Sequence, residues 1–184
     1  MSTLPCKVFI VFQIFLDMSI YYLCAKDSKK AQQVTLDFTT YLRKNFTAIA
    51  SEDTVPFEDE LEHTRAYLAV EQVQFEDSLQ VEYDISHKEF RLPPLTLQPI
   101  VENSIKHGMD PEYAPLCISI KTRETDSGSE IIVEDNGTGF DTSAKLETNT
   151  TLANIRQRLK IMCSGKLAIQ TREGGGTVVS VIIP

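Results

Sequence analysis

The most constraining feature of this 184-residue chain is the order of hydrophobic patterns in its second half. Apolar stretches typical of strands alternate with two stretches of helical spacing, separated by turns rich in Gly, Asp and Pro. The order is strand, helix, strand, strand, helix, strand, strand, which predicts a mixed sheet with helices on one face, a two-layer α/β sandwich. The strands are expected at 79–85, 116–123, 130–134, 167–171 and 177–183, and the helices at 95–106 and 152–162.

The part before this sandwich is predicted to be mostly helical. Residues 31–45 carry apolar side chains at helical spacing, and a second helix is expected after Pro56, because a proline loses no hydrogen bond at a helix start. We therefore expect two regions: residues 1–78, a helical region, and residues 79–184, the α/β sandwich.

Residues 4–24 are long and apolar enough to approach a membrane span. Lys7, Gln13 and Asp17 interrupt this run, and a charged side chain inside a bilayer costs about 2.5–3.5 kcal/mol on insertion scales. We therefore expect a helix that is buried or faces a partner, rather than a membrane span or a signal peptide.

The composition narrows the class of protein. Apolar residues make up 42% of the chain, enough for a folded core, and the formal charge of −8 argues against a nucleic-acid binder, which needs Lys and Arg against phosphates. The four cysteines form no CxxC pair, so a zinc site is not expected. Scattered cysteines fit a reducing cytosol, and we expect a cytoplasmic location.

The first candidate site lies on the predicted helix that ends near Gly108. Lys106 and His107 follow Asn103 by three and four residues, so the three side chains share one helix face. An amide oxygen suits a hard cation such as Mg²⁺, and a lysine supplies a charge for phosphate. The alternative is a plain amphipathic helix.

The second candidate site follows an apolar strand. Asp135 at the strand end could accept a hydrogen bond from an exocyclic amine, and Gly137 and Gly139 would let the backbone approach a flat ligand closely. A hairpin turn is the alternative, because turns also favour Asp and Gly. This pattern becomes specific when it follows the helix that carries Asn103.

A third set of residues lies near the C-terminus. Asn154 opens a segment with Arg156 and Arg158, and Gly176 precedes Thr177 after a run of glycines. Taken separately, the first segment is explained by a solvated helix face and the second by a hairpin turn.

Together these segments resemble the ATP-binding fold shared by histidine kinases, heat-shock chaperone ATPases, type II topoisomerases and MutL proteins, the Bergerat fold of GHKL ATPases. Segments 55–75 and 92–99 are in addition similar to those of LytS-type bacterial sensor histidine kinases. The likeness to these kinases extends from Tyr22 to Pro184, with residues 1–78 matching a degenerate dimerisation and phosphoacceptor region.

This resemblance implies an ATP site with Mg²⁺ as its metal. Asn103 would coordinate the Mg²⁺, and Lys106 and His107 would face the phosphates. The segment 136–151 would be a mobile lid over ATP, and Asn154 would open the helix beyond the lid, near the phosphates.

The same resemblance implies where the purine would lie. Asp135 would bind the adenine amine, and Gly137 and Gly139 would shape the purine pocket. Gly176 and Thr177 would close its far side. Such a protein would be a protein-histidine kinase that dimerises with itself or with a related kinase and serves a LytTR-type response regulator. Intact relatives would be anchored in the plasma membrane.

The phosphoacceptor histidine of the family is missing here. Its aligned position is Val11, and the only histidines of the chain are His63, His87 and His107. We interpret His63 and His87 as ordinary surface residues. Without an acceptor imidazole, phosphate transfer within this chain has no nucleophile.

Two further positions depart from relatives. The glycines that precede the family's Leu-x-Asn are replaced by residues 149–151, Asn-Thr-Thr, which would stiffen the lid. Hydrolysing relatives have a general-base Glu one helical turn before the metal-binding Asn, where this chain has Pro99. That replacement favours a kinase over an ATPase.

Three functions follow as hypotheses. The chain could be the catalytic end of a LytS-like kinase, truncated or degenerate at its N-terminus, that phosphorylates a histidine of a partner chain. It could instead be a non-catalytic ATP-binding module that dimerises with partner kinases and modulates them. The third hypothesis is an ATPase of the chaperone or MutL type, against which Pro99 counts.

Overall fold

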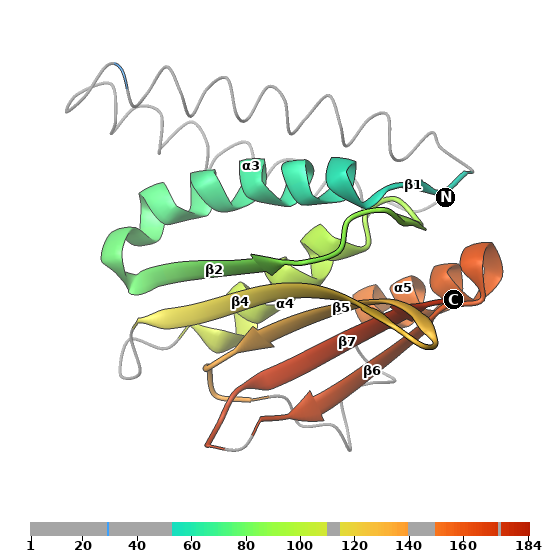
Figure 1. Cartoon of the computed structure of the whole chain (residues 1–184). Helices are drawn as coiled ribbons and strands as arrows, with labels where there is room; N and C mark the ends of the chain where they lie inside the picture. Colours follow the sequence, from blue (N-terminus) through green and yellow to red (C-terminus); the bar gives the residue numbers. More distant parts are fainter. Residues whose placement is uncertain (1–28, 30–52, 110–114, 140–149, 173) are drawn as a thin grey trace, which may run out of the picture.

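The computed structural model describes residues 29, 53–109, 115–139, 150–172 and 174–184 (Figure 1). Elements are labelled as in that figure. The helix expected at 31–45, the segment 4–24 and the aligned position Val11 lie outside the described residues. Within the described ranges, no helix combines the length and the apolar character needed to cross a membrane.

The centre of the fold is a five-stranded sheet in the order β2-β4-β5-β7-β6. Strands β2 and β4 are parallel, with Leu79 beside Leu116, and all other neighbouring pairs are antiparallel. The mixed sheet predicted from the sequence is therefore confirmed. Its strands are β2 (Leu79–Ile85), β4 (Leu116–Thr125), β5 (Gly128–Asp135), β6 (Lys166–Thr171) and β7 (Thr177–Ile183).

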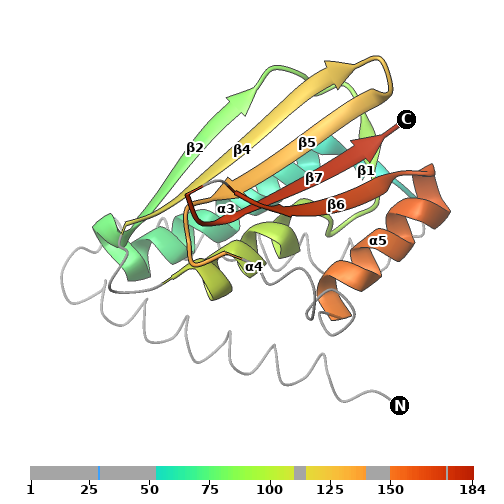
Figure 2. The ribbon, with the colours of Figure 1, turned by 90° about the horizontal axis from the view of Figure 1, so that it is seen from below.

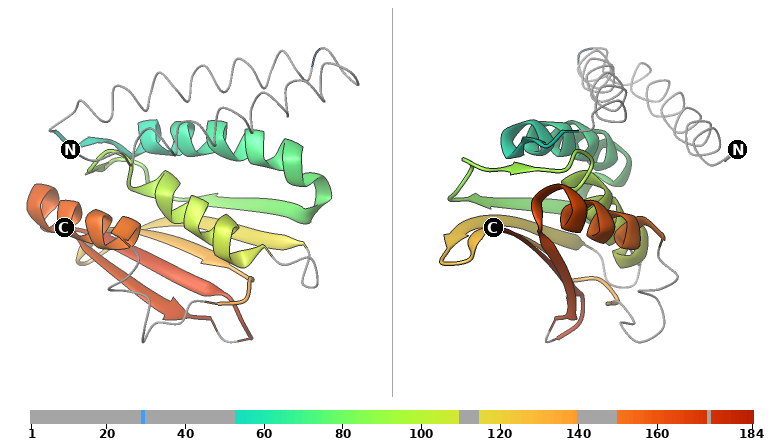
Figure 3. Two further views of the ribbon diagram at one scale, coloured as in Figure 1. Left: turned by 180° about the vertical axis from the view of Figure 1, so that it is seen from behind. Right: turned by 90° about the vertical axis from the view of Figure 1, so that its right-hand side faces the viewer.

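In the described part of the chain, three helices cover one face of this sheet: α3 (Phe57–Phe75), α4 (Leu97–Gly108) and α5 (Thr150–Cys163). They lie side by side, with α3 near β2, α4 over β4 and β5, and α5 near β6 (Figure 2; end view in Figure 3). Alternate residues of β5 and β7, such as Ile131 and Val179, point into this layer and are buried. The two-residue period of the strands thus places one apolar face against the helices.

The hydrophobic core continues across residue 78, where the sequence predicted a boundary. Phe57, Leu61 and Leu68 of α3 belong to the same buried cluster as Leu97 of α4 and Ile131 of the sheet. A short 3-10 turn, Glu76–Ser78, joins α3 directly to β2.

A two-stranded ribbon that the sequence did not predict lies at the start of α3. β1 (Val55–Pro56) pairs antiparallel with β3 (Arg91–Leu92), and the amide of Phe57 donates to the carbonyl of Phe90 at 3.0 Å. The ring of Phe57 also stacks on that of Phe90, with centroids 4.7 Å apart.

Two expectations need correction. Helix α4 begins at Leu97 and not at Leu95, because Leu95 has φ 55° and a left-handed backbone cannot continue a helix. His63 is not a surface residue: it is 2% exposed, on the buried side of α3. His87 is half-buried, and its Nε2 lies 3.0 Å from the hydroxyl of Ser129.

Candidate nucleotide site

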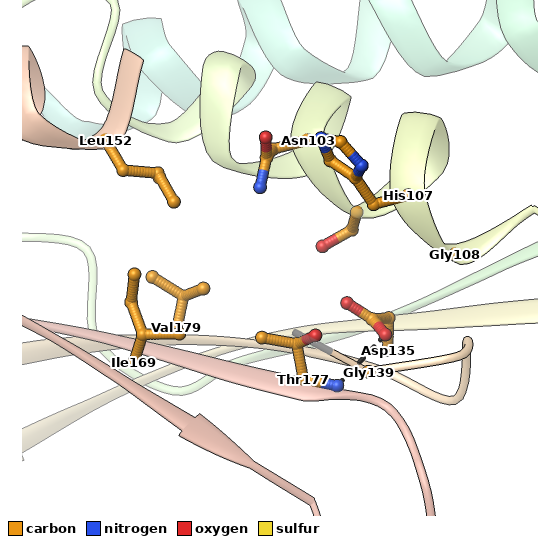
Figure 4. A pocket seen from close by; sticks show the side chains of 10 residues that line it. Asn103, His107, Gly108, Asp135, Gly139, Leu152, Ile169, Thr177 and Val179 are labelled. Carbon is orange, nitrogen blue, oxygen red and sulfur yellow. Dashed lines mark hydrogen bonds between the residues drawn. The ribbon is translucent and has the colours of Figure 1, made fainter. Parts of the chain in front are cut away.

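A pocket lies between α4 and the sheet, at the end of β5 (Figure 4). It is narrow, with about 10 Å³ of space that a water-sized molecule can reach. Asn103 and His107 approach it from α4, while Asp135 and Thr177 face them from the sheet. The lining residues are Asn103, Ser104, His107, Gly108, Asp135, Gly139, Leu152, Ile169, Thr177 and Val179.

Asp135 is the buried acid of this pocket, with 3% of its surface exposed. Its Oδ1 accepts hydrogen bonds from the amides of Gly137, at 3.1 Å, and Thr177, at 3.0 Å. The hydroxyl of Ser104 bonds to the same carboxylate. A carboxylate has about four acceptor positions, so these three donors leave room for a further donor from a ligand.

Burial raises the pKa of Asp135 above its ordinary value, because desolvation disfavours the charged form. The three hydrogen bonds and the positive charge of Arg172 oppose this rise. The pocket thus holds an oriented acid whose ionised form is supported by donors from the turn after β5, from β7 and from α4.

Two glycines that the sequence assigned to the site support Asp135 without lining the pocket. A Cβ at Gly176, which has φ 99°, would lie 2.0 Å from the carbonyl oxygen of Asp135. Gly137 packs against the backbone of Gly108 at the end of α4. Both glycines therefore permit close backbone approach around the acid, and Gly139 is the one of the three that lines the pocket.

The α4 side of the pocket follows the helical spacing seen in the sequence. Asn103 and His107 line the pocket one turn apart, and Ser104 lies between them. The hydroxyl of Thr138 donates to the carbonyl of His107 at 3.1 Å and ties the turn after β5 to the end of the helix. Lys106 is exposed on α4 and is not among the lining residues.

Leu152, Ile169 and Val179 form the apolar wall of the pocket. They come from α5, β6 and β7, and Figure 4 shows them grouped at one end of the pocket, away from Asp135. An apolar wall opposite a few polar groups is the usual composition of a small-molecule site.

The structure does not bring every predicted site residue to this pocket. Asn154 is exposed on α5 and lines a separate hollow with Leu95, Pro99 and Arg158. Thr151, assigned to the lid, lies in the first turn of α5, and residues 140–149 lie outside the described part of the chain. The roles of these residues stay predictions.

Several lining residues were missed by sequence reasoning. Ser104 follows Asn103 directly and could have been read from its place on the helix face that carries Ile100 and Val101 to the core. Leu152, Ile169 and Val179 carry no such indication, because a core leucine and a pocket leucine have the same pattern in a sequence.

The metal that the resemblance implies would have few protein ligands among the described residues. No cluster of three or more His, Cys, Asp or Glu side chains with metal-binding geometry occurs among the described residues. Mg²⁺ commonly keeps several waters and binds through few protein ligands together with phosphate oxygens. An amide oxygen of Asn103 beside a nucleotide fits that pattern.

The fold is that of histidine kinase catalytic domains. The catalytic domain of histidine kinase ThkA superposes with a TM-score of 0.56 at 16% identity, covering 71% of this chain and 94% of that domain. The mycobacterial sensor histidine kinase MprB gives a TM-score of 0.58 at 12% identity, covering 73% of this chain and 97% of that one. The predicted α/β sandwich of the histidine kinase-like ATPases is thereby confirmed.

Sequence comparisons show similarity to histidine kinases. A histidine kinase family model matches residues 18–79. Sensor protein LytS of Oceanobacillus iheyensis is 34% identical over 182 residues, which cover 90% of this chain and 31% of LytS. YwpD of Bacillus subtilis is 34% identical over 174 residues, covering 90% of this chain and 63% of YwpD.

The chain is therefore a homologue of the LytS-type sensor histidine kinases, as the sequence motifs predicted. Sensor histidine kinase YpdA of Escherichia coli is a further relative, 31% identical over 163 residues, which cover 84% of this chain and 28% of YpdA. The chain spans less than a third of the length of the LytS relatives and of YpdA.

Proposed function

We propose that the chain binds Mg-ATP in the pocket between α4 and β5, with the adenine amine on Asp135. The observation that carries this proposal is the environment of Asp135: it is buried, its orientation is set by two backbone amides, and it retains acceptor capacity. An exocyclic amine is a donor and would complete this arrangement. Leu152, Ile169 and Val179 would receive the apolar surface of the base.

The pocket has about 10 Å³ of water-accessible space and is too narrow to take a whole nucleotide as it stands. A purine would enter it only after the surrounding side chains move apart. The triphosphate would then lie outside it, with Mg²⁺ bound by the phosphates and Asn103. His107 and the exposed Lys106 would lie on the same side of α4 as these phosphates.

We further propose that the bound ATP serves phosphate transfer to a histidine of a partner chain. The bond between the γ-phosphorus and the β–γ bridging oxygen would break, a bond from the phosphorus to an imidazole nitrogen would form, and ADP and the imidazole proton would leave. His63 is an unsuitable acceptor, because it is 2% exposed. His107 lines the pocket itself, and His87 lies in the segment between β2 and β3.

Nucleotide binding is tested by titrating a fluorescent ATP analogue, with and without Mg²⁺, into wild type and Asp135→Ala. Asp126→Ala is the matched control, since Asp126 is an exposed acid in the turn between β4 and β5 and its loss changes the net charge equally. We expect binding by wild type and the control and at least a tenfold loss in Asp135→Ala. Equal affinity of all three proteins would refute the site.

Competition by unlabelled nucleotides tests the orientation of the base. ATP presents an amine to Asp135, whereas GTP presents a carbonyl oxygen, which an ionised carboxylate repels. ATP should therefore displace the analogue and GTP should fail at the same concentration. Equal displacement by the two nucleotides would show that Asp135 does not contact the purine edge.

Transfer is tested by mixing the chain and ATP labelled at the γ-phosphate with an intact LytS-type kinase whose own ATP site has been inactivated. Acid-labile label on that kinase supports the proposed transfer. Dimerisation without label would favour a non-catalytic ATP-binding module. Release of free phosphate by the chain alone would favour an ATPase, against which Pro99 counts at the position of a general base.

A further inference from the structure

The segment between β3 and α4 has an unusual backbone. It consists of residues 93–96, of which Pro93, Pro94 and Thr96 are buried. Leu95 has φ 55°, a conformation that a branched side chain adopts only where the surroundings enforce it. Thr96, at the start of α4, makes no capping bond with its side chain, whose hydroxyl donates instead to the carbonyl of Pro93 at 2.6 Å.

Glu60 of α3 supplies the cap that α4 lacks. Its Oε1 accepts from the amide of Leu95 at 2.7 Å, and its Oε2 accepts from the amides of Thr96 at 2.8 Å and Leu97 at 3.0 Å. The first amides of a helix have no partner within the helix and carry its positive dipole end, so a carboxylate binds them well. Here the carboxylate comes from a different helix, and Glu60 is 3% exposed.

Arg158 of α5 holds the same segment from its carbonyl side. Its two terminal nitrogens donate to the carbonyls of Pro94 and Leu95, each at 2.6 Å. Burial raises the pKa of Glu60, and the three amides and then the charge of Arg158 oppose that rise. Segment 93–96 is thus bound through its backbone by Glu60 of α3 on one side and by Arg158 of α5 on the other.

Burying a carboxylate such as Glu60 contributes little to stability by itself, because desolvation cancels much of the gain from its hydrogen bonds and from the nearby charge of Arg158. The hydrogen bonds of Glu60 and Arg158 instead fix the relative positions of α3, α4 and α5. Helix α4 carries Asn103, Ser104 and His107 to the pocket, and α5 carries Leu152. Neither Glu60 nor Arg158 lines that pocket.

We propose that Glu60 and Arg158 are positioning residues for the nucleotide pocket, which hold α4 and α5 in register with α3 through segment 93–96. A displacement of α3 would then move the start of α4 and, through Leu95 and Arg158, the α5 wall of the pocket. This inference rests on the proposed binding of ATP at Asp135.

The first test measures nucleotide affinity in Glu60→Gln and Arg158→Lys. A Gln can accept at one oxygen only, and a Lys cannot place two parallel donors on two carbonyls. Ile183→Val, a core change at the far end of β7, is the control for stability. Glu60→Asp, which keeps the charge on a shorter side chain, should recover part of the affinity.

Positioning predicts that both variants bind the ATP analogue about tenfold more weakly at a temperature where each is fully folded, while Ile183→Val keeps wild-type affinity. The double variant should lose less than the product of the two single losses, because both act through one segment. Wild-type affinity in both folded variants would overturn the inference, as a merely structural role lowers only the unfolding midpoint.

The second test needs no nucleotide. Amide hydrogen exchange of the free protein should quicken in Glu60→Gln both at the start of α4 and along α5, with which Glu60 makes no hydrogen bond among the described residues. A change confined to α4 would overturn the coupling. Failure of wild type to bind ATP would refute the proposed function, and the exchange result would then decide the coupling by itself.

Discussion

Gly108 and Gly137 pack backbone against backbone: a Cβ on Gly137 would lie 2.3 Å from the Cα of Gly108. This contact joins the last residue of α4 to the turn that follows β5, at the edge of the pocket. Asp135, two residues before Gly137, is oriented in part by the amide of Gly137.

Gly137→Ala should therefore damage both folding and binding. The new methyl group meets backbone that cannot rotate away, so α4 must shift from β5, and overpacking of this kind costs about 1–3 kcal/mol. Urea unfolding and the ATP-analogue titration measure the two effects. In the control Gly174→Ala, where a Cβ meets no atom within 4 Å, only the left-handed backbone should cost about 1 kcal/mol, with affinity unchanged. Similar losses of affinity in both variants would contradict the steric explanation.

Removing Ser104 should shift the pH dependence of nucleotide binding. Its hydroxyl bond lowers the pKa of Asp135, which burial raises, so Ser104→Ala should raise that pKa further. The affinity for the ATP analogue should then fall at a higher pH than in wild type as the solution is acidified. The control is Ser180→Ala, because Ser180 donates to Glu130, on the sheet face opposite the helices. Identical pH profiles for Ser104→Ala and wild type would refute this role of Ser104.

The raised pKa of Glu71 predicts that the free energy of unfolding depends on pH up to the neutral range. Burial, and more weakly the charge of Glu102, raise the pKa of Glu71 from 4.5 to about 7, against a hydrogen bond from Tyr67. The folded state thus binds this proton more tightly than the unfolded state. This tighter proton binding stabilises the folded state fully below pH 4.5, and the stabilisation is lost as the pH rises through about 7. Wild type should lose up to about 3 kcal/mol over this window relative to Glu71→Gln in urea titrations. Parallel curves for the two proteins would contradict the shifted pKa.

Asn136 should matter for folding more than for binding. Its Oδ1 accepts from the amide of Cys117 at 2.6 Å, and its Nδ2 donates to the carbonyl of Pro115 at 3.2 Å, so it fastens the start of β4 to the end of β5. Asn136→Ala should cost about 1–3 kcal/mol of unfolding free energy. Asn136→Asp keeps the acceptor oxygen but loses the donor. Its unfolding free energy should therefore lie between those of wild type and Asn136→Ala. At a temperature where both variants are fully folded, their nucleotide affinity should stay within twofold of wild type. A tenfold loss of affinity would place Asn136 in the site.

The strands could be predicted from the sequence because their two-residue period depends on local alternation alone. The β1–β3 ribbon could not, because two-residue strands with a proline have no period to detect. The start of α4 was misplaced because its cap is Glu60, more than thirty residues earlier in the chain. His63 appeared to be a surface residue because α3 buries polar side chains, such as Thr64, whose hydroxyl donates within its own helix.

In the site, too, features with a local sequence pattern could be predicted, and features that depend on distant contacts could not. Motif spacing named Asn103, His107 and Asp135, and the fold places all three around one pocket. The spacing could not show that Gly137 and Gly176 act through backbone contacts, since both need a partner distant in sequence. Nor could it show that Asn154 faces a different hollow, because that depends on how α5 packs.

The continuity of the core into α3 limits how such a domain can be recombined. An exchange of the chain at residue 78 would cut Phe57, Leu61 and Leu68 from the apolar cluster they complete and remove the acid that caps α4. A gene fusion, natural or engineered, would therefore keep this core and the cap of α4 together only when its junction lies before Val55. Residues 55–184, with α3 included, are thus the stretch whose described contacts such an exchange has to keep together.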